Sequence, residues 1–429
     1  MTDRKTSHHL PIFNCLNKRY WLGLGLLLAS LVLLGCSDSN NSSRPKDEAP
    51  SELAALAEDI SSANGERAAI LHILTAEGKA WDVVAGMANV ATQTPAKLGD
   101  LAEVGSVSKV FLAVTVLRLI EQGTLSLEDP LTQWFDEAQL DALTANNGAK
   151  LILRHLLNHS SGIGDYLNFA PDETVLETYG VTGERSYIPE ELIEITVELT
   201  RNPVDTERQF PWFTPQDAAG NSYPDYDSIP FSAYSNTGYV MLGMIVQAVT
   251  GERYEDMIRQ EIIDPLGLED TGFGTDEVRP DLTGYALGLD VSGEDPVISS
   301  PTLTWSAGQI ISTPPDLAHF LSALYNGELF DQAETLDMWK SEYYKPLFQV
   351  QELPYGLGIY MRELDGVGTV YGHDGQVFGA VALVAYDVAT GDVYSAAVNN
   401  SQYVSVDGQV PSTIWELVPK LHKIATDNR

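Results

Sequence analysis

The run from Val110 to Gln122 is apolar on nearly every side when it is wound as a helix. Such a helix has no polar face to turn towards water, so it must lie in the interior with other elements around it. The stretch Gly105-Ser-Val-Ser-Lys109 comes immediately before this run. We therefore expect the first turn of the helix, which carries the positive end of the helix dipole, to be held rigidly.

Within that first turn, Ser106 and Lys109 lie three residues apart and so share one face. A hydroxyl beside an amine is a way to make a nucleophile without histidine. The pattern alone is weak, because an N-cap serine followed by an exposed lysine looks the same. The same spacing recurs at Ser43 and Lys46, in a Ser/Asn/Pro-rich stretch that no helix follows.

The N-terminal region has the pattern of an export signal. Basic residues precede an apolar run, Leu22 to Leu34, which is shorter than the about 20 residues that span a bilayer comfortably. The run ends in Leu33-Leu-Gly-Cys36, which resembles the lipobox of bacterial lipoproteins. We therefore expect residues 1–35 to be a lipoprotein signal peptide and Cys36 to carry the lipid. An uncleaved membrane anchor is the alternative, and both predict an exported, membrane-anchored protein facing the periplasm or the outer membrane.

The composition limits what the rest of the chain can do. Cys15 and Cys36 are the two cysteines, so no disulfide is expected in the folded body. Residues 36–52 read as a disordered tether. The chain has 25 basic and 60 acidic residues, a net charge of −35. This balance argues against nucleic acid and against anionic lipid as partners, and the oligomeric state stays open.

The expected elements suggest one discontinuous α/β unit with an inserted lobe. Strand-like runs occur near both ends of the body, and the middle reads as helices with long connections, including 202–230. We expect a single catalytic domain over 53–425, with its α/β part at about 53–150 and 300–425 and a helical lobe at about 150–300. A cleft between the two parts is the expected place for a site. The expected helices and strands are helix 53–62, strands 68–74 and 81–90, helix 237–249, strands 355–362, 367–371, 380–387 and 393–399, and helix 410–424.

Two further motifs lie in the two parts of the chain that are expected to form the walls of this cleft. Tyr234-Ser-Asn236 lies just before an apolar helix of the middle region, and His373-Asp-Gly375 follows a strand near the C-terminus. Tyr-x-Asn also occurs at Tyr166, so each motif alone is weak. The three elements in this order are far more specific.

With these motifs the chain resembles the penicillin-recognising serine hydrolases: class C β-lactamases, serine D-Ala-D-Ala carboxypeptidases, D-aminopeptidases and related esterases. The nearest likeness is to the exported carboxypeptidases, because the third element is His-x-Gly and not Lys-Thr-Gly. The resemblance implies an antiparallel sheet flanked by N- and C-terminal helices, plus a mostly helical lobe, with the active site between them. The motifs that carry it are Gly105-Ser-Val-Ser-Lys109, Arg154-His-Leu-Leu-Asn-His-Ser-Ser-Gly162, Tyr234-Ser-Asn236, Trp305-Ser-Ala-Gly308, Tyr355-Gly-Leu-Gly358 and Tyr371-Gly-His-Asp-Gly375.

The resemblance also implies roles. Ser106 becomes acylated, and Lys109 helps to deprotonate it, directly or through Tyr234, so the base is assigned to the pair. Tyr234 hands a proton to the leaving group, Asn236 holds Lys109 and the substrate amide, and His373 supplies a donor or positive charge at the far wall. The oxyanion hole is formed by the backbone N–H groups of Ser106 and Gln376.

The substrate-binding wall departs from the closest relatives. Asp374 and Gln376 stand beside Gly375 where hydroxyls are expected, and Tyr360 stands at the position of a carboxylate-binding arginine. Arg362 lies two residues on, hence on the same strand face, and is the candidate replacement. Trp305 is expected to line the pocket, with a core position as the alternative.

The resemblance implies neither a metal nor a cofactor. His155 and His159 are spaced like a zinc pair, but no glutamate follows His155 and no third ligand motif is visible. The leading expectation is a carboxypeptidase-like serine hydrolase acting on cell-wall peptides. The alternatives are an esterase, amidase or D-aminopeptidase on small acyl substrates, then a β-lactamase, and, from another class, a non-catalytic penicillin-binding sensor.

Overall fold

The computed structural model describes residues 48–144, 148–167, 186–201, 234–276, 278–285, 296–297, 300–342, 344–347, 353–377, 379–400 and 413–429. The proposed signal segment, Cys36 and the connection 202–230 lie outside these residues. Residues 46–429 form one compact unit. The expected tether does not extend to residue 52, because the first helix, α1, already begins at Ser51.

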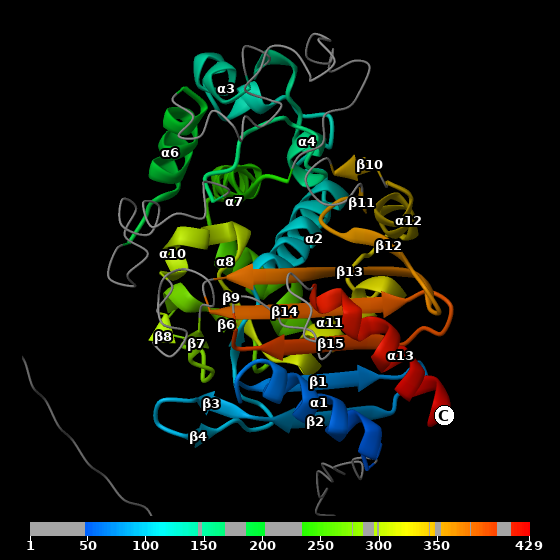
Figure 1. Cartoon of the computed structure of the whole chain (residues 1–429). Helices are drawn as coiled ribbons and strands as arrows, with labels where there is room; N and C mark the ends of the chain where they lie inside the picture. The colour runs from blue at the N-terminus through cyan, green and yellow to red at the C-terminus, as the bar shows by residue number, and fades with distance from the viewer. Residues whose placement is uncertain are drawn as a thin grey trace, which may run out of the picture. The chain divides into compact units, whose positions relative to one another are not determined.

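An eight-stranded antiparallel sheet forms the centre of this unit, with the order β10-β11-β12-β13-β14-β15-β1-β2 (Figure 1). Strands from the two ends of the chain meet in it, since β1 pairs with β15. The strands of the described residues are β1 Ala69–Leu74, β2 Ala80–Ala85, β3 Met87–Asn89, β4 Thr94–Pro95, β5 Ala102–Glu103, β6 Gly272–Phe273, β7 Gly284–Tyr285, β8 Pro296–Val297, β9 Ile310–Ser312, β10 Tyr344–Leu347, β11 Leu353–Tyr355, β12 Tyr360–Leu364, β13 Gly368–Val377, β14 Ala380–Asp387 and β15 Val393–Val398.

Helices cover both faces of the sheet. On one face, α1 and α13 pack their apolar side chains against alternate strand residues such as Leu71 and Tyr394. On the opposite face lies α11, and the Ser395 hydroxyl donates to the Pro314 carbonyl oxygen at 2.7 Å. The α-helices are α1 Ser51–Ala63, α2 Ser108–Glu121, α3 Glu137–Leu143, α4 Leu153–Leu157, α6 Pro189–Arg201, α7 Asn236–Thr250, α8 Tyr254–Ile258, α9 Asp264–Leu266, α10 Pro301–Thr304, α11 Pro314–Asn326, α12 Ala333–Ser341 and α13 Leu417–Asp427. None of the described helices is both long and apolar enough to cross a bilayer.

Helix α2 is buried along most of its length, as its composition predicts. It belongs to the largest apolar cluster together with α7, and the rings of Phe111 and Phe320 stack at 3.7 Å. A 3₁₀ turn, η1 (Gly105–Val107), leads into it. Short helical turns also occur at η2 Leu131–Gln133, η3 Gly148–Lys150, η5 Arg259–Ile263 (a π-helix), η6 Gly274–Asp276, η7 Trp305–Ala307 and η8 Ile414–Glu416.

Two expected strands are each divided in the structure. The run 81–90 separates into β2 and β3 at Gly86, whose φ of +81° favours glycine. The run 355–362 separates into β11 and β12 at Gly358, with φ +88°. A Cβ atom at Gly358 would lie 2.4 Å from the Cβ of Ala113 on α2, so packing requires glycine there. Alternation of apolar residues predicts strands but does not show where a glycine turns the chain.

Two other boundaries also differ. The strand expected at 367–371 continues to Val377 as β13, so His373 lies within a strand and does not follow one. The pairing of His373 with Val384 of β14 extends the strand past the glycines. The closing helix α13 begins at Leu417, after the turn η8, and ends at Asp427.

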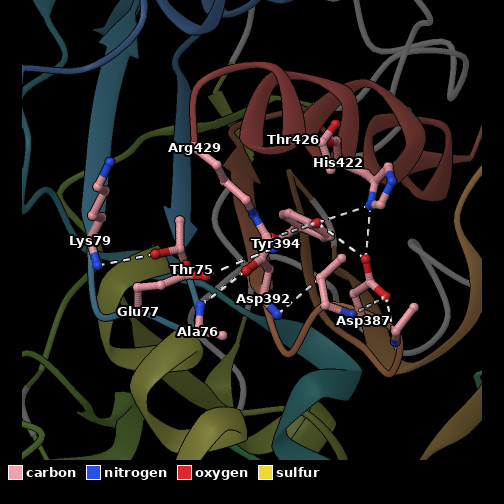
Figure 2. A network of polar contacts seen from close by, with 12 residues as sticks. Thr75, Ala76, Glu77, Lys79, Asp387, Asp392, Tyr394, His422, Thr426 and Arg429 are labelled. Atoms are coloured by element: carbon pink, nitrogen blue, oxygen red, sulfur yellow. Dashed lines mark hydrogen bonds and ion pairs between the residues drawn. The ribbon is translucent and has the colours of Figure 1, made fainter.

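A polar network joins the β14–β15 turn to α13 (Figure 2). Asp387 and Asp392 are both fully buried. The Asp387 Oδ2 atom accepts from His422 Nδ1 at 2.8 Å, and the Asp392 carboxylate accepts from the Ala76 backbone N–H at 3.0 Å and from the Arg429 guanidinium. The Tyr394 hydroxyl lies within 3.4 Å of one oxygen of each carboxylate. This network therefore fixes the C-terminal segment against the sheet through two buried carboxylates.

We expect Asp392→Ala to lower the free energy of unfolding by about 2 kcal/mol, because it removes a fully buried carboxylate that accepts from the Ala76 backbone N–H and from the Arg429 guanidinium. Urea unfolding measures this. Asp427→Ala is the control, since it removes an exposed carboxylate that pairs with exposed Lys423 and should change stability by about 0.5 kcal/mol or less. Equal effects of the two changes would contradict the account of the network.

Candidate active site

The candidate nucleophile lies where η1 meets α2. Ser106 occupies the middle of η1 and is partly exposed, whereas Lys109 lies in the first turn of α2 and has no exposed surface. Gly105 has φ +51°, in the region that favours glycine. The turn thus presents the serine hydroxyl at the surface of the site while the lysine amine approaches it from the interior.

Three oxygen atoms surround the Lys109 amine. Its Nζ atom lies 2.7 Å from Asn236 Oδ1, 2.7 Å from the Ala307 carbonyl oxygen and 3.1 Å from Ser106 Oγ. The first two oxygens can only accept hydrogen bonds, whereas a hydroxyl can also donate. A neutral amine has two N–H bonds and one lone pair. In that state both N–H groups are used by Asn236 and Ala307, and the lone pair points at the hydroxyl of Ser106.

The protonation state of Lys109 follows from its burial. Burial lowers the pKa of this amine from 10.5 to about 7, and the negative charge of Asp165 opposes part of that shift. A substantial fraction of the amine is therefore neutral near pH 7. Lys109 can then accept the proton of Ser106 without help from histidine.

Asn236, the first residue of α7, links Lys109 to a buried carboxylate. Its Nδ2 atom donates to Asp165 Oδ2 at 2.8 Å, and the backbone N–H of Leu167 donates to the other oxygen, Oδ1, at 2.9 Å. Asp165 is 2% exposed. Burial raises its pKa from 3.8 to about 6, against the opposing hydrogen bonds and the charge of Lys109.

Tyr234 lies beside Ser106 and Lys109. Lys109 Nζ is 4.9 Å from its ring centre, and its hydroxyl is buried beside that of Ser106. Burial raises the pKa of Tyr234 well above its usual value; neighbouring tyrosines and Asp374 add to the shift, and the Ser106 hydroxyl opposes it. The phenol therefore stays protonated at neutral pH and is suited to donate a proton.

His159 supports this tyrosine. Its ring lies 4.3 Å from the ring of Tyr234, and its Nδ1 atom accepts from the backbone N–H of Ser235 at 3.2 Å. His155 Nδ1 accepts from the backbone N–H of Ile152 at 3.3 Å. Both histidines thus have hydrogen-bond roles in the scaffold. Across the described ranges, no three histidine, cysteine or acidic side chains are grouped so that they could hold a metal ion.

His373 differs from the expectation of a positive charge. Its Nδ1 atom contacts the backbone oxygen of Asp374, which can only accept, so Nδ1 carries the hydrogen. Nε2 is then an acceptor and takes the hydroxyl hydrogen of Tyr355 at 3.0 Å. Burial lowers the pKa of His373 from 6.5 to about 3. At neutral pH the wall therefore contains a neutral imidazole with both nitrogens engaged, which does not fit the positive-charge alternative, and a donor role for His373 stays a prediction.

The backbone of β13 passes directly over η1. A Cβ atom at Gly375 would lie 2.7 Å from the Ser106 nitrogen and 1.9 Å from the Val104 carbonyl oxygen, and one at Gly105 would lie 2.9 Å from the Gln376 nitrogen. Only glycines permit this approach. The structure thus brings the two expected oxyanion-hole nitrogens, of Ser106 and Gln376, into one neighbourhood.

The remaining wall residues have different surroundings. Arg362 stacks over the ring of Trp415 at 4.2 Å, and burial lowers its pKa while the charge of Asp374 opposes the shift. Asp374 is partly exposed and also acts on the pKa of Tyr360, which burial mainly raises. Trp305 is 8% exposed and packs edge-to-face on Tyr254 at 4.6 Å. Trp305 thus belongs to the apolar core cluster, as the alternative expects, and a role in lining the pocket stays a prediction.

Sequence reasoning missed two groups of the site, Asp165 and the carbonyl of Ala307. The carbonyl is presented by the turn η7, in which Trp305 has φ +39°, an unusual value for a side-chain-bearing residue. The motif Trp305-Ser-Ala-Gly308 contains this turn, but no side chain marks a backbone acceptor. Asp165 follows the Ser-Ser-Gly162 motif closely, yet a single acidic residue is a common surface residue.

Comparison with known proteins identifies the family of the chain. The family model described as Beta-lactamase matches residues 53–410. The chain belongs to the Beta-lactamase family. Its α/β fold, with an antiparallel sheet and covering helices, is the one that the motifs imply and is shared with penicillin-binding proteins and D-amino acid amidases of known structure. Its placement in a His-x-Gly subgroup stays a prediction.

Individual relatives of this family member are distant. Penicillin-binding protein 4* of Bacillus subtilis (strain 168) is 25% identical over 307 residues, which cover 68% of this chain and 58% of that protein. The chain therefore spans less than two thirds of that relative. The crystal structure of D-amino acid amidase from Ochrobactrum anthropi SV3 complexed with L-phenylalanine amide is 26% identical, with a TM-score of 0.66, and covers 88% of this chain and 99% of that one. D-stereospecific amidohydrolase from Streptomyces sp. is 25% identical, with a TM-score of 0.61 and coverages of 82% and 94%.

The buried lysine predicts a characteristic dependence of stability on pH. The unfolded state binds more protons than the native state between pH 7 and 10.5, because the pKa of Lys109 is lower when folded. Stability contributed by this residue therefore rises as the pH increases through that window. We expect the free energy of unfolding of Lys109→Met to exceed that of the wild type by the largest amount at pH below 7. This difference should shrink progressively towards pH 10.5, and urea unfolding at each pH measures it.

Lys97→Met is the matched control, because Lys97 is exposed. Its difference from the wild type should stay constant across the same window. A constant difference for Lys109→Met as well would contradict a lowered pKa.

Proposed function

We propose that the chain is a serine amidase and esterase that works through an acyl-enzyme on Ser106. The observation that carries this proposal is the set of contacts around Lys109. Two obligate acceptors take its N–H groups and leave its lone pair 3.1 Å from the hydroxyl of Ser106. Such an arrangement has little value for a structural lysine, which would be more stable in water.

Acylation begins with transfer of the Ser106 proton to Lys109 as Oγ attacks the carbonyl carbon of the substrate. The C=O π electrons move to oxygen, and the backbone N–H groups of Ser106 and Gln376 stabilise the resulting oxyanion. Losing one such donor typically raises the barrier by about 3 kcal/mol. The directions of the pKa shifts favour Lys109 as the base, since Tyr234 stays protonated.

Expulsion of the leaving group needs a proton. The Tyr234 hydroxyl, which is buried beside Ser106, can give it to the departing nitrogen or oxygen, and the Lys109 ammonium can replace it. Water then attacks the acyl carbonyl and gives its proton to the same pair. The acyl group leaves as the acid, and Ser106 regains its hydrogen.

Several observations support a substrate with a free amino group in place of a terminal carboxylate. His373 is neutral, and Asp374 contributes a negative charge near Tyr234 and Tyr360. A substrate carboxylate would be repelled there and an ammonium attracted. The similarity to the D-amino acid amidase and to the D-stereospecific amidohydrolase supports amides and esters of D-amino acids as the substrate class.

A D-Ala-D-Ala carboxypeptidase acting on cell-wall peptides is the second candidate. Arg362 favours it, because its buried Nε atom has no hydrogen-bond partner among the described residues, and this cation could bind a carboxylate. The similarity to a penicillin-binding protein points the same way. Export and lipid anchoring through Cys36 complete the proposal and rest on the sequence pattern of residues 1–36 alone.

The test is to incubate the full-length protein with D-phenylalanine amide, a D-Ala-D-Ala peptide, benzylpenicillin and a nitrophenyl ester. Intact mass and product release report acylation and turnover. We expect turnover of the amide and the ester, with no adduct in Ser106→Ala. Turnover of the D-Ala-D-Ala peptide in preference to the amide supports the second candidate. Absence of any adduct and any turnover, or reaction that persists in Ser106→Ala, would overturn the covalent mechanism.

Two variants separate the substrate classes. Asp374→Asn should lower kcat/KM for the amide, which carries an ammonium, by about tenfold and leave the ester much less affected. Arg362→Ala should impair only substrates that carry a carboxylate. Equal losses on all substrates in either variant would mean that the residue acts only on the fold.

A further inference from the structure

We infer that Asp165 is a positioning residue: it fixes the amide of Asn236 so that the lone pair of Lys109 faces Ser106. This inference rests on the proposed acyl-enzyme chemistry and adds a residue that the motifs do not include. Asp165 lies in the segment after α4, where it precedes Tyr166, and its side chain is 98% shielded from water.

The orientation of Asn236 decides which way the lone pair points. An asparagine side chain has nearly the same shape in its two flipped orientations, but one end accepts and the other donates. With Oδ1 towards Lys109, the amide takes an N–H of the amine at 2.7 Å. With Nδ2 there, a donor would face the amine. The lone pair would then be drawn to Asn236 and away from Ser106.

A carboxylate at position 165 allows one of these orientations. Its Oδ1 atom accepts from the backbone N–H of Leu167 at 2.9 Å, and its Oδ2 atom accepts from Asn236 Nδ2 at 2.8 Å. An ionised carboxylate cannot donate, so the flipped amide would place oxygen against oxygen in a buried site. That arrangement leaves two buried acceptors unpaired, which is strongly unfavourable.

Asp165 is also the charged partner of Lys109. The other titratable groups that face the amine are Tyr234 and Tyr239, whose rings lie 4.9 Å and 5.4 Å from Nζ, and His159 and His373. Burial lowers the pKa of both histidines and raises the pKa of both tyrosines, so all four are neutral near pH 7. The Asp165 carboxylate is thus the group whose charge holds the pKa of Lys109 up to about 7.

The experiment follows phosphonylation of Ser106 by a fluorophosphonate in the full-length protein. Fluoride leaves without needing a proton from Tyr234, so the rate reports how readily Ser106 is deprotonated. Intact mass gives the rate as a function of pH for the wild type, Asp165→Asn and the control Asp387→Asn. Asp387 is likewise a buried carboxylate, and the hydrogen-bond partners of its carboxylate lie in the network of Figure 2 and the adjoining turn and include no residue of the Ser106 site.

For Asp165→Asn we expect the high-pH rate to fall by about 10- to 100-fold, since the amide of Asn236 is no longer fixed. We also expect the acid limb of the profile to move down by about one pH unit, because Lys109 loses its negative neighbour. The acid limb of the Asp387→Asn profile should lie at the same pH as that of the wild type. A merely structural role would lower the rate and leave the limb in place.

The outcomes are distinguishable. A wild type that is not labelled at Ser106 overturns the proposed function itself. If the wild type is labelled but the acid limb of the Asp165→Asn profile stays in place or moves to higher pH, the role of Asp165 is overturned. The assignment of Ser106 as the nucleophile then still stands. Should Asp165→Asn not fold, Asp165→Ser removes the same charge with a smaller side chain and carries the same prediction.

Discussion

The burial of the Lys109 amine is the constraint on which the site depends. A lysine without exposed surface has lost its hydration, and among the described residues no carboxylate is hydrogen-bonded to it. The neutral form is therefore favoured, which makes the residue useful as a base near pH 7 and unfavourable for stability below that pH. Activity and instability thus have the same physical origin.

The fold supplies the rigid surroundings that this burial requires. The apolar helix α2 carries Lys109 into the core, α7 brings Asn236, and the turn η7 brings the carbonyl of Ala307. Across the site, β13 can lie against η1 because Gly375 has no side chain. Segments far apart in the sequence therefore meet at one serine, and packing holds each of them in place.

Much of this arrangement could be predicted from the sequence. The all-round apolar pattern of residues 110–122 predicts a buried helix, and the three motifs predict the sides of the site. Side-chain patterns do not reveal backbone acceptors such as Ala307, nor whether a histidine is charged, since that depends on burial and on partners like Tyr355. Strand ends at Gly86 and Gly358 depend on contacts with distant segments, so alternation alone cannot place them.

The same limits explain why the proposed substrates are amides and esters, whereas the sequence favoured cell-wall peptides. His-x-Gly suggested a donor or a cation at this wall, but His373 is buried and neutral, and its Nδ1 hydrogen is directed at the Asp374 carbonyl. The sequence also could not show that Asp374 acts on Tyr234, because that depends on how β13 is oriented. Whether such a side chain is charged or can donate follows only when its hydrogen-bond partners are known.

The most direct test is an NMR titration of ¹⁵N-labelled lysine side chains in the full-length protein, with the Lys109 Nζ resonance assigned from its loss in Lys109→Met. The account predicts that this amine titrates with a pKa of about 7. A Lys109 pKa near the ordinary value of 10.5 would contradict it, because Lys109 would then be an ammonium at neutral pH and could not take the proton of Ser106.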